Sequence, residues 1–513
     1  MKKFVYNLIF FIWPCVALFH EEIRRTQFPD KFLFGASTSS YQIEGAVLED
    51  GRGLSSWDVF SHIQGTIVDG LNADVAADHY HQWEDDIKLL HLLGVDSYRF
   101  SISWSRILPR GRFGEINHIG IKFYDKLIDD LLHKGIVPFV TLSHYDIPQE
   151  LEDRYQSWLS PLIQEDFLFF AEICFKSFGD RVKYWVTINE PVLFTALAYL
   201  HGIYPPGRCS APFGNCSSGN SDREPLIVIH NMILSHTKAV EVYRKHYQPK
   251  QGGYIGIVVD AMMYEPYKDD DIGRDAVNRA LAFNVAWVLD PLIHGYYPPE
   301  MRQHLGEDLP VFSVEDSNKM KDSLDFIGLN HYTSAYAKDC ILSACEPCSS
   351  RAIAGYVNVT GERDGIPIGE KTAMYFIHVV PNGMEKIIEY LKTRYNNKPV
   401  FVTENGYPGN ELLDDIKRVE YHKSYLASLA RAIKGGADVR GYFVWSLMDT
   451  FEWTSGYSLR FGLHYVDFRT LERKPKLSAK WYKDFLTNGT KSNHQYITKK
   501  GIIKDEGLEI NRL

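Results

Sequence analysis

Two glutamates stand at the ends of short apolar runs that lie far apart in the sequence. Glu190 ends the run YWVTINE (184–190), and Glu404 follows the apolar start of PVFVTENG (399–406). A carboxylate at the end of a buried strand lies in a low dielectric on a rigid support. Taken alone, Glu-Asn-Gly is also good turn chemistry, so a strand ending in a polar turn is the simpler interpretation of that segment. Two such carboxylates across a cleft would suit cleavage of a glycosidic bond, one ionised to attack the anomeric carbon and one protonated to assist the leaving oxygen.

The ends of the other strand-like runs carry amides, imidazoles, carboxylates and aromatic rings at high density. A metal-dependent hydrolase would need clustered histidine and aspartate ligands, which these ends lack. A serine hydrolase would need a G-x-S-x-G elbow, and none occurs. The sequence therefore predicts neither a metal nor a cofactor. Beside the two glutamates, the side chains at the strand ends are Arg99, Ser101, His144, Asp146, Asn189, Asn330, His331, Tyr332, Thr403, Asn405, Trp445, Glu452 and Trp453.

Apolar runs typical of buried strands alternate with helical patterns along most of the chain. One helical pattern extends from Trp83 to Leu93 and stops at Gly94. Eight strands, each followed by a helix or loop, are typical of a (β/α)8 TIM barrel, which places its active site at the carboxyl ends of the strands. An open doubly wound sheet is disfavoured because no glycine-rich phosphate loop follows the first strand. The predicted strands are residues 32–38, 97–103, 137–143, 184–190, 253–260, 324–332, 399–405 and 441–447.

This alternation accounts for nearly the whole chain and predicts a single domain over residues 21–490. No linker, repeat or low-complexity tract interrupts it, and the long segments 200–225 and 335–380 are expected to be insertions on the barrel rim. Residues 1–20 place two lysines before a short apolar run, the pattern of a secretory signal peptide. An uncleaved membrane anchor is the alternative. Residues 491–513 are polar and predict a loose tail.

The cysteines beyond the predicted signal peptide fall mostly in loops. Cys209 and Cys216 flank one loop, and Cys340, Cys345 and Cys348 cluster in another. In an oxidising compartment such neighbours are expected to form disulfides, and we predict bonds in the first loop and between Cys340 and Cys345, with the pairing of Cys348 left open. A zinc site at the cluster is disfavoured because no histidine lies at suitable spacing.

Charge and composition narrow the range of partners. The net charge of −9 and the pI near 6.1 argue against nucleic acid or an anionic membrane as the main partner. The 31 Tyr, 29 Phe and 10 Trp would suit the apolar faces of sugar rings, although most of them are expected to fill the core. Three N-x-S/T sequons, at Asn215, Asn358 and Asn488, fit a secreted glycoprotein.

Six ordered motifs between Phe28 and Leu486 resemble those of one enzyme family. They are FLFGASTSSYQIEGA, YRFSISWSRILP, TINEP, DFIGLNHYT, VTENG and WSLMDTFEW. The chain resembles glycoside hydrolase family 1, the retaining β-glucosidases. This resemblance implies that Glu190 is the general acid/base and that Glu404 is the nucleophile.

The same resemblance assigns roles to the surrounding side chains. It places Arg99 and Tyr332 against the nucleophile, where a cation and a phenol hold the carboxylate ionised and aligned. It gives Asn330 a supporting role. The sugar-binding residues that it implies are Gln42, His144, Asn189, Tyr332, Trp445, Glu452, Trp453 and Phe461.

At two positions the residue in this chain can be compared with the residue usual in the family or in the plant thiosidases. The family usually has Trp directly after the histidine of the third strand, and this chain has Tyr145. We expect its hydroxyl to replace the indole as a donor to a sugar hydroxyl, so that activity survives. Plant thiosidase relatives lose the acid/base glutamate, and the presence of Glu190 argues against that specialisation.

The loop sequences point to a class of substrate. ILPRGRFGEIN, PQELEDRYQSWL and GRCSAPFGNCSSGNSDREP look most like the plant enzymes that hydrolyse monolignol glucosides such as coniferin and syringin. Phe376 departs from them, since many plant relatives carry an aglycone-contacting Trp there. The expected reaction is a double displacement through a covalent glucosyl-enzyme, with a small-molecule β-glucoside as partner. A glucosyltransferring member and a non-catalytic sugar-binding relative are the alternatives.

The predicted signal peptide also indicates a location. We expect secretion to the cell wall or apoplast, with the vacuole as the alternative, and no membrane contact in the mature form. The sequence predicts no oligomeric state.

Overall fold

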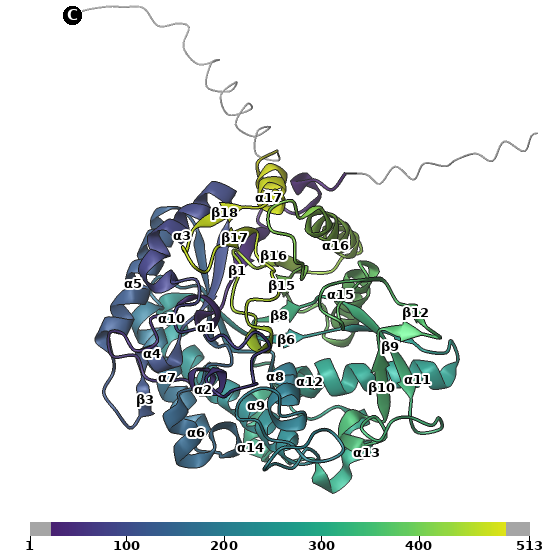
Figure 1. The fold of residues 1–513 in the computed structure, drawn as a ribbon. Coiled ribbons are helices and arrows are strands. Elements are labelled where there is room, and N and C mark those ends of the chain that lie inside the picture. The colour runs from purple at the N-terminus through teal and green to yellow at the C-terminus, as the bar shows by residue number, and fades with distance from the viewer. Residues whose placement is uncertain (1–21, 489–513) are drawn as a thin grey trace, which may run out of the picture.

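The computed structural model, which describes residues 22–488, contains a closed barrel of eight parallel strands surrounded by helices (Figure 1). Each strand pairs with its neighbour along the chain, and β1 closes the ring on β16 with Leu33 opposite Gly441 and Ser37 opposite Trp445. All eight predicted strands are confirmed, and the architecture is the predicted (β/α)8 barrel. The barrel strands are β1 (Leu33–Ser37), β2 (Ser97–Ser101), β4 (Val137–Ser143), β5 (Tyr184–Asn189), β6 (Tyr254–Asp260), β8 (Phe326–Asn330), β15 (Val400–Asn405) and β16 (Val439–Trp445).

After each barrel strand the chain forms a helix that covers the outside of the barrel (Figure 1). The first, α3, ends at Leu93, and Gly94 follows it with a φ of 78°. Glycine adopts this left-handed conformation without strain, which explains why the helix stops at the predicted residue. These helices are α3 (His79–Leu93), α5 (His118–His133), α7 (Ile163–Phe178), α9 (Glu224–Val242), α12 (Trp287–His294), α15 (Asn382–Arg394), α16 (Ile416–Lys434) and α17 (Leu477–Asn488).

A layer of phenylalanines fills the interior of the barrel. The ring of Phe139 lies 5.1 to 5.5 Å, between centroids, from those of Phe326, Phe401 and Phe443. All four are buried in one cluster. Edge-to-face packing of this kind makes the barrel a filled core rather than a pore. A substrate cavity must therefore open above this layer, at the carboxyl ends of the strands.

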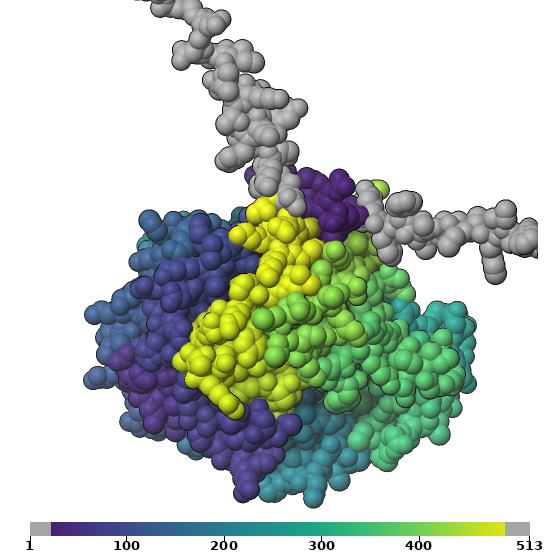
Figure 2. Space-filling model, turned by 45° about the horizontal axis from the view of Figure 1, so that its top comes forward, coloured from purple at the N-terminus to yellow at the C-terminus, as the bar shows by residue number. Residues whose placement is uncertain are grey.

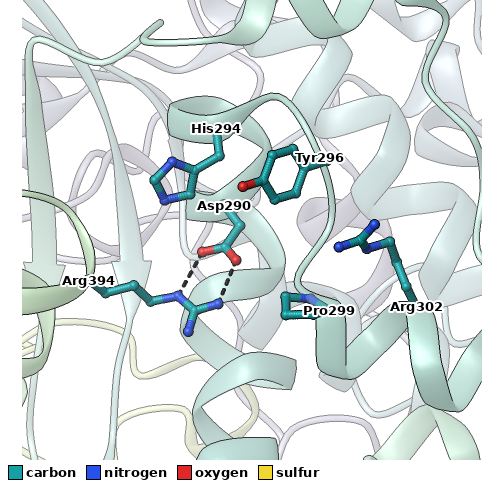
Figure 3. Close-up of a pocket in the computed structure, with 6 residues that line it drawn as sticks. All are labelled: Asp290, His294, Tyr296, Pro299, Arg302 and Arg394. Atoms are coloured by element: carbon teal, nitrogen blue, oxygen red, sulfur yellow. Dashed lines mark hydrogen bonds and ion pairs between the residues drawn. The ribbon is translucent and has the colours of Figure 1, made fainter.

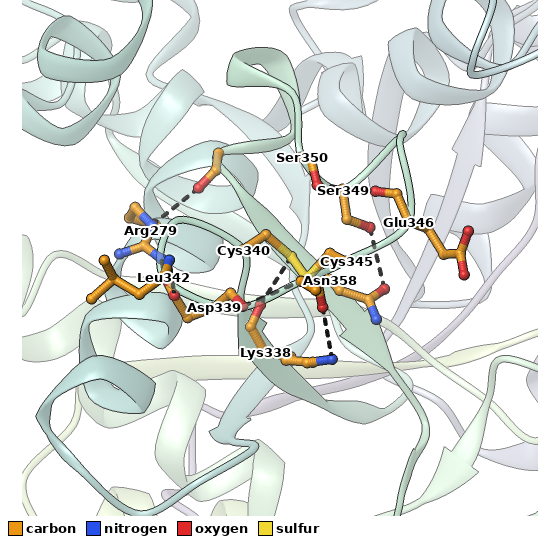
Figure 4. The surroundings of a disulfide bond; sticks show 12 residues. Arg279, Lys338, Asp339, Cys340, Leu342, Cys345, Glu346, Ser349, Ser350 and Asn358 are labelled. Carbon is orange, nitrogen blue, oxygen red and sulfur yellow. Dashed lines mark hydrogen bonds and ion pairs between the residues drawn. A yellow bond between two sulfur atoms is a disulfide. The ribbon is translucent and has the colours of Figure 1, made fainter.

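The predicted insertion at 335–380 builds a small sheet on the rim. Strand β9 (Ser334–Asp339) pairs with β10 (Val357–Thr360) on one side and β7 (Met263–Pro266) on the other. A disulfide between Cys340 and Cys345 closes the loop that follows β9, as Figure 4 shows. Beside it, the buried Arg279 Nη2 donates to Asp339 Oδ1 at 2.5 Å.

The second predicted disulfide, between Cys209 and Cys216, is also present and lies in the other insertion. Cys174 is a buried free thiol, as expected for an apolar helix, and Cys348 is also unbonded to sulfur. Of the sequons, Asn215 is exposed. Asn358 is half-buried on β10, where its Oδ1 accepts a hydrogen bond from Ser349 Oγ at 3.3 Å (Figure 4).

The two ends of the described chain lie side by side at one end of the barrel. The rings of Phe28 and Phe485 are 6.3 Å apart, and Figures 1 and 2 show α17 against the N-terminal segment. The predicted signal peptide and polar tail lie outside the described residues, as does the side chain of Asn488. Within residues 22–488, no helix is long and apolar enough to cross a membrane.

Candidate active site

Both glutamates lie where a barrel strand loses regular pairing. Strand β15 shifts register against β8 between Val402 and Glu404, and β5 shifts against β6 between Val186 and Asn189. Such bulges re-aim side chains and occur beside active sites. Glu190 then takes left-handed backbone angles, φ 45° and ψ 61°, at the start of α8 (Pro191–Thr195). A strained conformation at a non-glycine residue persists only where surrounding structure enforces it.

The segment after Glu404 is not the polar turn that its sequence suggests. Asn405 is the last residue of β15 and is fully buried, with its Nδ2 donating to His331 O at 2.7 Å and to the Tyr421 hydroxyl at 2.9 Å. A Cβ on Gly406 would lie only 2.2 Å from Trp445 O. Close packing of two strands, rather than turn geometry, therefore explains this Asn-Gly pair.

Glu404 is held by a cation and a phenol. The fully buried Arg99 donates from Nη1 to Glu404 Oε1, and the Tyr332 hydroxyl donates to Oε2 at 2.6 Å. The other end of the guanidinium, Nη2, donates to Asn189 Oδ1 at 2.6 Å. Both carboxylate oxygens thus face donors, and the fixed positive charge suits the ionised form. This arrangement fixes the orientation of the Glu404 carboxylate.

Glu190 has neutral partners instead. Asn330 Nδ2 donates to its Oε1 at 2.8 Å, and the Tyr145 hydroxyl donates to its Oε2. Burial, reinforced by the negative charges of Glu404 and Asp260, raises the pKa of Glu190 to about 8. Its environment therefore favours the protonated acid at neutral pH.

The two carboxyl groups therefore sit in contrasting surroundings. One lies against a guanidinium, and the other lies among neutral donors with a raised pKa. When two neighbouring acids have environments that differ in this way, one is suited to act as an anion and the other as a proton donor.

Buried amides connect the two acids. Asn330 Nδ2 also donates to Asn189 Oδ1 at 3.2 Å, while Asn330 Oδ1 accepts from Thr403 Oγ1 at 2.7 Å. Asn189 Nδ2 lies 3.2 Å from His144 Nε2. Burial and the charge of Arg99 hold the pKa of His144 well below its usual value, so the ring is neutral. Side chains from the ends of several strands thus join both glutamates in one hydrogen-bonded network.

A cavity of about 580 Å³ opens over this network, a volume within the range of sites for small organic ligands. Both glutamates line its inner part, and the outer part is largely apolar. The predicted sugar-binding and supporting residues on its wall are His144, Asn330, Tyr332, Trp445, Glu452, Trp453 and Phe461. Outer lining residues include Val68, Leu193, Leu197, Ile203, Met262, Met374, Tyr375 and Phe376.

Aromatic rings and one acid form the sugar-sized inner wall. Trp445 and Phe461 belong to one buried cluster, and Trp453 stacks on Tyr41 with ring centroids 6.1 Å apart. Burial raises the pKa of Glu452 to about 8, and Thr450 Oγ1 donates to its carboxyl. An aromatic face beside a polar acid gives a sugar ring both stacking and directed hydrogen bonds.

Two predicted sugar-binding residues are not on the cavity wall. Gln42 is fully buried, donating from Nε2 to Phe451 O at 2.9 Å and Thr450 Oγ1 at 3.3 Å, while its Oε1 accepts from Ser39 Oγ. Asn189 bridges Arg99 and His144 from behind the cavity. In this structure both side chains position other groups of the site.

One residue of the cavity was not selected from the sequence, and another has a different hydrogen-bond partner from the one expected. Asp260 ends β6 and lines the cavity, and burial raises its pKa to about 6. The strand-end criterion that selected Glu190 would also have selected it. The hydroxyl of Tyr145, expected to serve a sugar hydroxyl, is directed at Glu190 instead.

A second hollow, of about 330 Å³, lies among the outer helices, as Figure 3 shows. Its acid, Asp290, already accepts hydrogen bonds from Arg394 Nε at 2.9 Å and Nη2 at 2.6 Å. A carboxylate satisfied by a bidentate guanidinium is a structural ion pair and not an acid/base pair. Within residues 22–488, no cluster of three or more His, Cys, Asp and Glu side chains could hold a metal ion.

The chain is similar over most of its length to proteins named as β-glucosidases. The chain is 56% identical over 474 residues to a protein of Oryza sativa subsp. japonica named "Probable inactive beta-glucosidase 14", covering 91% of this chain and 92% of that protein. It is 51% identical over 474 residues to the coniferin beta-glucosidase of Pinus contorta, covering 90% and 92%. A solved rice β-glucosidase, a glutamate-to-glutamine mutant in a covalent complex with Glc, matches with a TM-score of 0.88 and 45% identity over 90% of this chain and 99% of that one.

The family model for Glycosyl hydrolase family 1 matches residues 24–491, which include the whole barrel. This match and the β-glucosidases among the relatives agree with the paired acids at the ends of β5 and β15. The chain belongs to glycosyl hydrolase family 1 and is a β-glucosidase of the plant type.

Proposed function

We propose that this enzyme hydrolyses aryl β-glucosides of the phenylpropanoid class, with coniferin- and syringin-type monolignol glucosides as its substrates, and that it retains configuration at the anomeric carbon. The observation that carries the mechanism is the contrast between Glu404 against Arg99 and Glu190 with its raised pKa. Two acids so differentiated supply the nucleophile and the proton donor of a double displacement.

In the first step, Glu404 attacks the anomeric carbon while Glu190 gives its proton to the glycosidic oxygen. The bond between the anomeric carbon and that oxygen breaks, and the alcohol or phenol leaves. In the second step, Glu190 takes a proton from water, whose oxygen attacks the anomeric carbon and releases Glu404. The covalent complex with Glc in the rice relative supports an intermediate of this kind.

The outer cavity supports an aromatic aglycone. Leu193, Met262 and Phe376 line it, and Phe376 keeps 43% of its surface exposed at the mouth. Apolar and aromatic walls favour a flat phenyl group over a charged or strongly hydrated one. The similarity to the coniferin beta-glucosidase of Pinus contorta points the same way.

Release of glucose from coniferin and syringin, beside a flavonoid glucoside and a cyanogenic glucoside, tests this proposal. We expect the highest kcat/KM on the monolignol glucosides. The variant Phe376→Ala should raise KM for coniferin while leaving methyl β-glucoside hydrolysis unchanged, because the methyl group does not reach the outer wall. A preference for another aglycone would refute the substrate class while leaving the mechanism intact.

A non-catalytic sugar-binding role is the second candidate, because a relative at 56% identity is named as probably inactive. Binding of glucosides with no turnover of any of them would establish it. Both acids and their partners are in place here, which favours catalysis. Glucose transferred mainly to added alcohols would instead indicate a transferring enzyme.

A further inference from the structure

We propose that Tyr145 is a positioning residue for the acid/base glutamate, with a phenol that donates a hydrogen bond to the Glu190 carboxylate and accepts one from its protonated form. This inference rests on the proposed function of Glu190. It concerns a position where the chain departs from its family, and it gives the departure a role in both chemical steps.

The Tyr145 ring is clamped so that its hydroxyl meets Glu190 Oε2. It stacks on Phe194 with centroids 5.4 Å apart and lies 5.0 Å from the Trp453 ring. Phe194 belongs to α8, the helix that Glu190 begins, and its N–H donates to Glu190 O at 3.0 Å. One short helix therefore carries the acid and also supports the ring that binds it.

The backbone also fixes this orientation. Tyr145 has a φ of 75°, which is uncommon for a bulky residue, and only 5% of its surface is exposed. A strained backbone inside a packed aromatic cluster leaves the side chain little freedom to turn elsewhere. The contact with Glu190 is therefore a built feature of the site.

A phenol suits an acid that must both release and take up a proton. A tyrosine hydroxyl can donate or accept, whereas an indole N–H can only donate. When Glu190 is protonated, its O–H can point to the Tyr145 oxygen until a glycosidic oxygen replaces it. Once Glu190 has given its proton away, the phenol turns and donates to the new carboxylate.

The groups around Glu190 show why such a donor matters. Burial, followed by the negative charges of Glu404 and Asp260, raises its pKa, while the hydrogen bonds from Tyr145 and Asn330 oppose that rise. The phenols of Tyr204 and Tyr332 also lie in this environment, and Tyr332 donates to Glu404. Loss of the Tyr145 donor should therefore raise the pKa of Glu190 in every state of the cycle.

The first test is Tyr145→Phe, followed by two pH profiles. The basic limb of kcat/KM reports Glu190 as an acid. The acidic limb of kcat on 2,4-dinitrophenyl β-glucoside, whose leaving group needs no proton, reports Glu190 as a base. Both limbs should move to higher pH by about 1 to 2 units, the expected effect of losing one hydrogen bond to a charged group.

Azide provides an independent readout of the second step. It attacks the anomeric carbon of the glucosyl-enzyme as an anion and breaks the bond to Glu404 without releasing a proton, so it needs no base. At a pH below the shifted limb, azide should restore the kcat of Tyr145→Phe on the dinitrophenyl substrate. Tyr482→Phe is the matched control, because it removes a buried tyrosine hydroxyl that donates to Gly35 O at 3.0 Å, far from the cavity. It should move neither limb.

A second variant covers the case in which Tyr145→Phe does not fold. Incorporation of 3,5-difluorotyrosine at position 145 keeps the shape and makes the hydroxyl a stronger donor, so both limbs should move to lower pH. The inference would be overturned if the limbs of the two pH profiles do not move in either folded variant, or if they move in the opposite direction. If Glu190→Gln is inactive while the Tyr145 variants are silent, this inference alone fails. If Glu190→Gln hydrolyses coniferin normally, the proposed function fails.

Discussion

Replacing Glu190 by Gln should stabilise the folded protein while it removes the proton donor. Glu190 is buried, and its pKa rises from about 4.5 to about 8 on folding. Because the folded-state pKa is the higher one, stability falls as pH rises from about 4.5 to about 8. At about 1.36 kcal/mol per unit, the difference is about 3 kcal/mol at pH 7 and about 5 kcal/mol above pH 8.

Glutamine removes this dependence without disturbing the neighbours. Its Oε1 can accept from Asn330, and its NH2 can donate to the Tyr145 oxygen. For a chain of this length, each kcal/mol changes Tm by roughly 1 °C. The Tm of Glu190→Gln should therefore exceed that of the parent by about 4 °C at pH 8 and by less than about 1 °C at pH 5.

Thermal unfolding at the two pH values measures this difference. Glu84→Gln, on the exposed face of α3, is the control and should change Tm little and equally at both pH values. If Glu190→Gln gains nothing at pH 8 relative to pH 5, then Glu190 is not a buried acid held in its protonated form, and its assignment as proton donor loses its physical basis.

Three further predictions follow from the same network. The kcat/KM for hydrolysis should decline above pH about 8 as Glu190 ionises. A pH–rate profile in which kcat/KM already falls with rising pH from about pH 5 would contradict its raised pKa. Arg99→Met should lower the free energy of unfolding, measured by urea denaturation, by about 3–5 kcal/mol, because it leaves Glu404 buried without its cation. It should also reduce kcat/KM at least ~100-fold. A stable and active variant would refute the pairing of Arg99 with Glu404. The double variant Cys209→Ser/Cys216→Ser should lose about 2.5 kcal/mol of stability, as expected for a short loop, with kcat at 25 °C unchanged; a large loss of kcat would show that this loop shapes the cavity.

The barrel could be predicted from the sequence because each strand is buried on both sides. Runs such as residues 137–143 and 184–190 are mostly apolar, with one threonine each before the strand end, and helical patterns stop at glycines such as Gly94. Local patterns of this kind indicate which segments of the chain are buried. The rim was recognised only as insertions, because short strands such as β9 and β10 depend on pairing partners that the sequence does not identify.

The acids of the site could be predicted by type and strand position, but their partners could not. Glu190 and Glu404 end apolar runs, whereas the direction of the Tyr145 hydroxyl depends on a left-handed backbone and on the rings of Phe194 and Trp453. The hydrogen bond from the buried Gln42 Nε2 to Phe451 O is likewise a contact that the sequence did not indicate. Such contacts join residues far apart in sequence, and no local pattern encodes them.

Glu404 has the central role in this mechanism, as the nucleophile. Treatment with a 2-deoxy-2-fluoro-β-glucoside bearing a good leaving group should trap the glucosyl-enzyme, and digestion with mass spectrometry should locate the sugar. We predict one fluoroglucosyl group, bound to the peptide that contains VTENG and lost from that peptide in Glu404→Gln. A label on another residue, or steady hydrolysis by Glu404→Gln, would contradict the central claim.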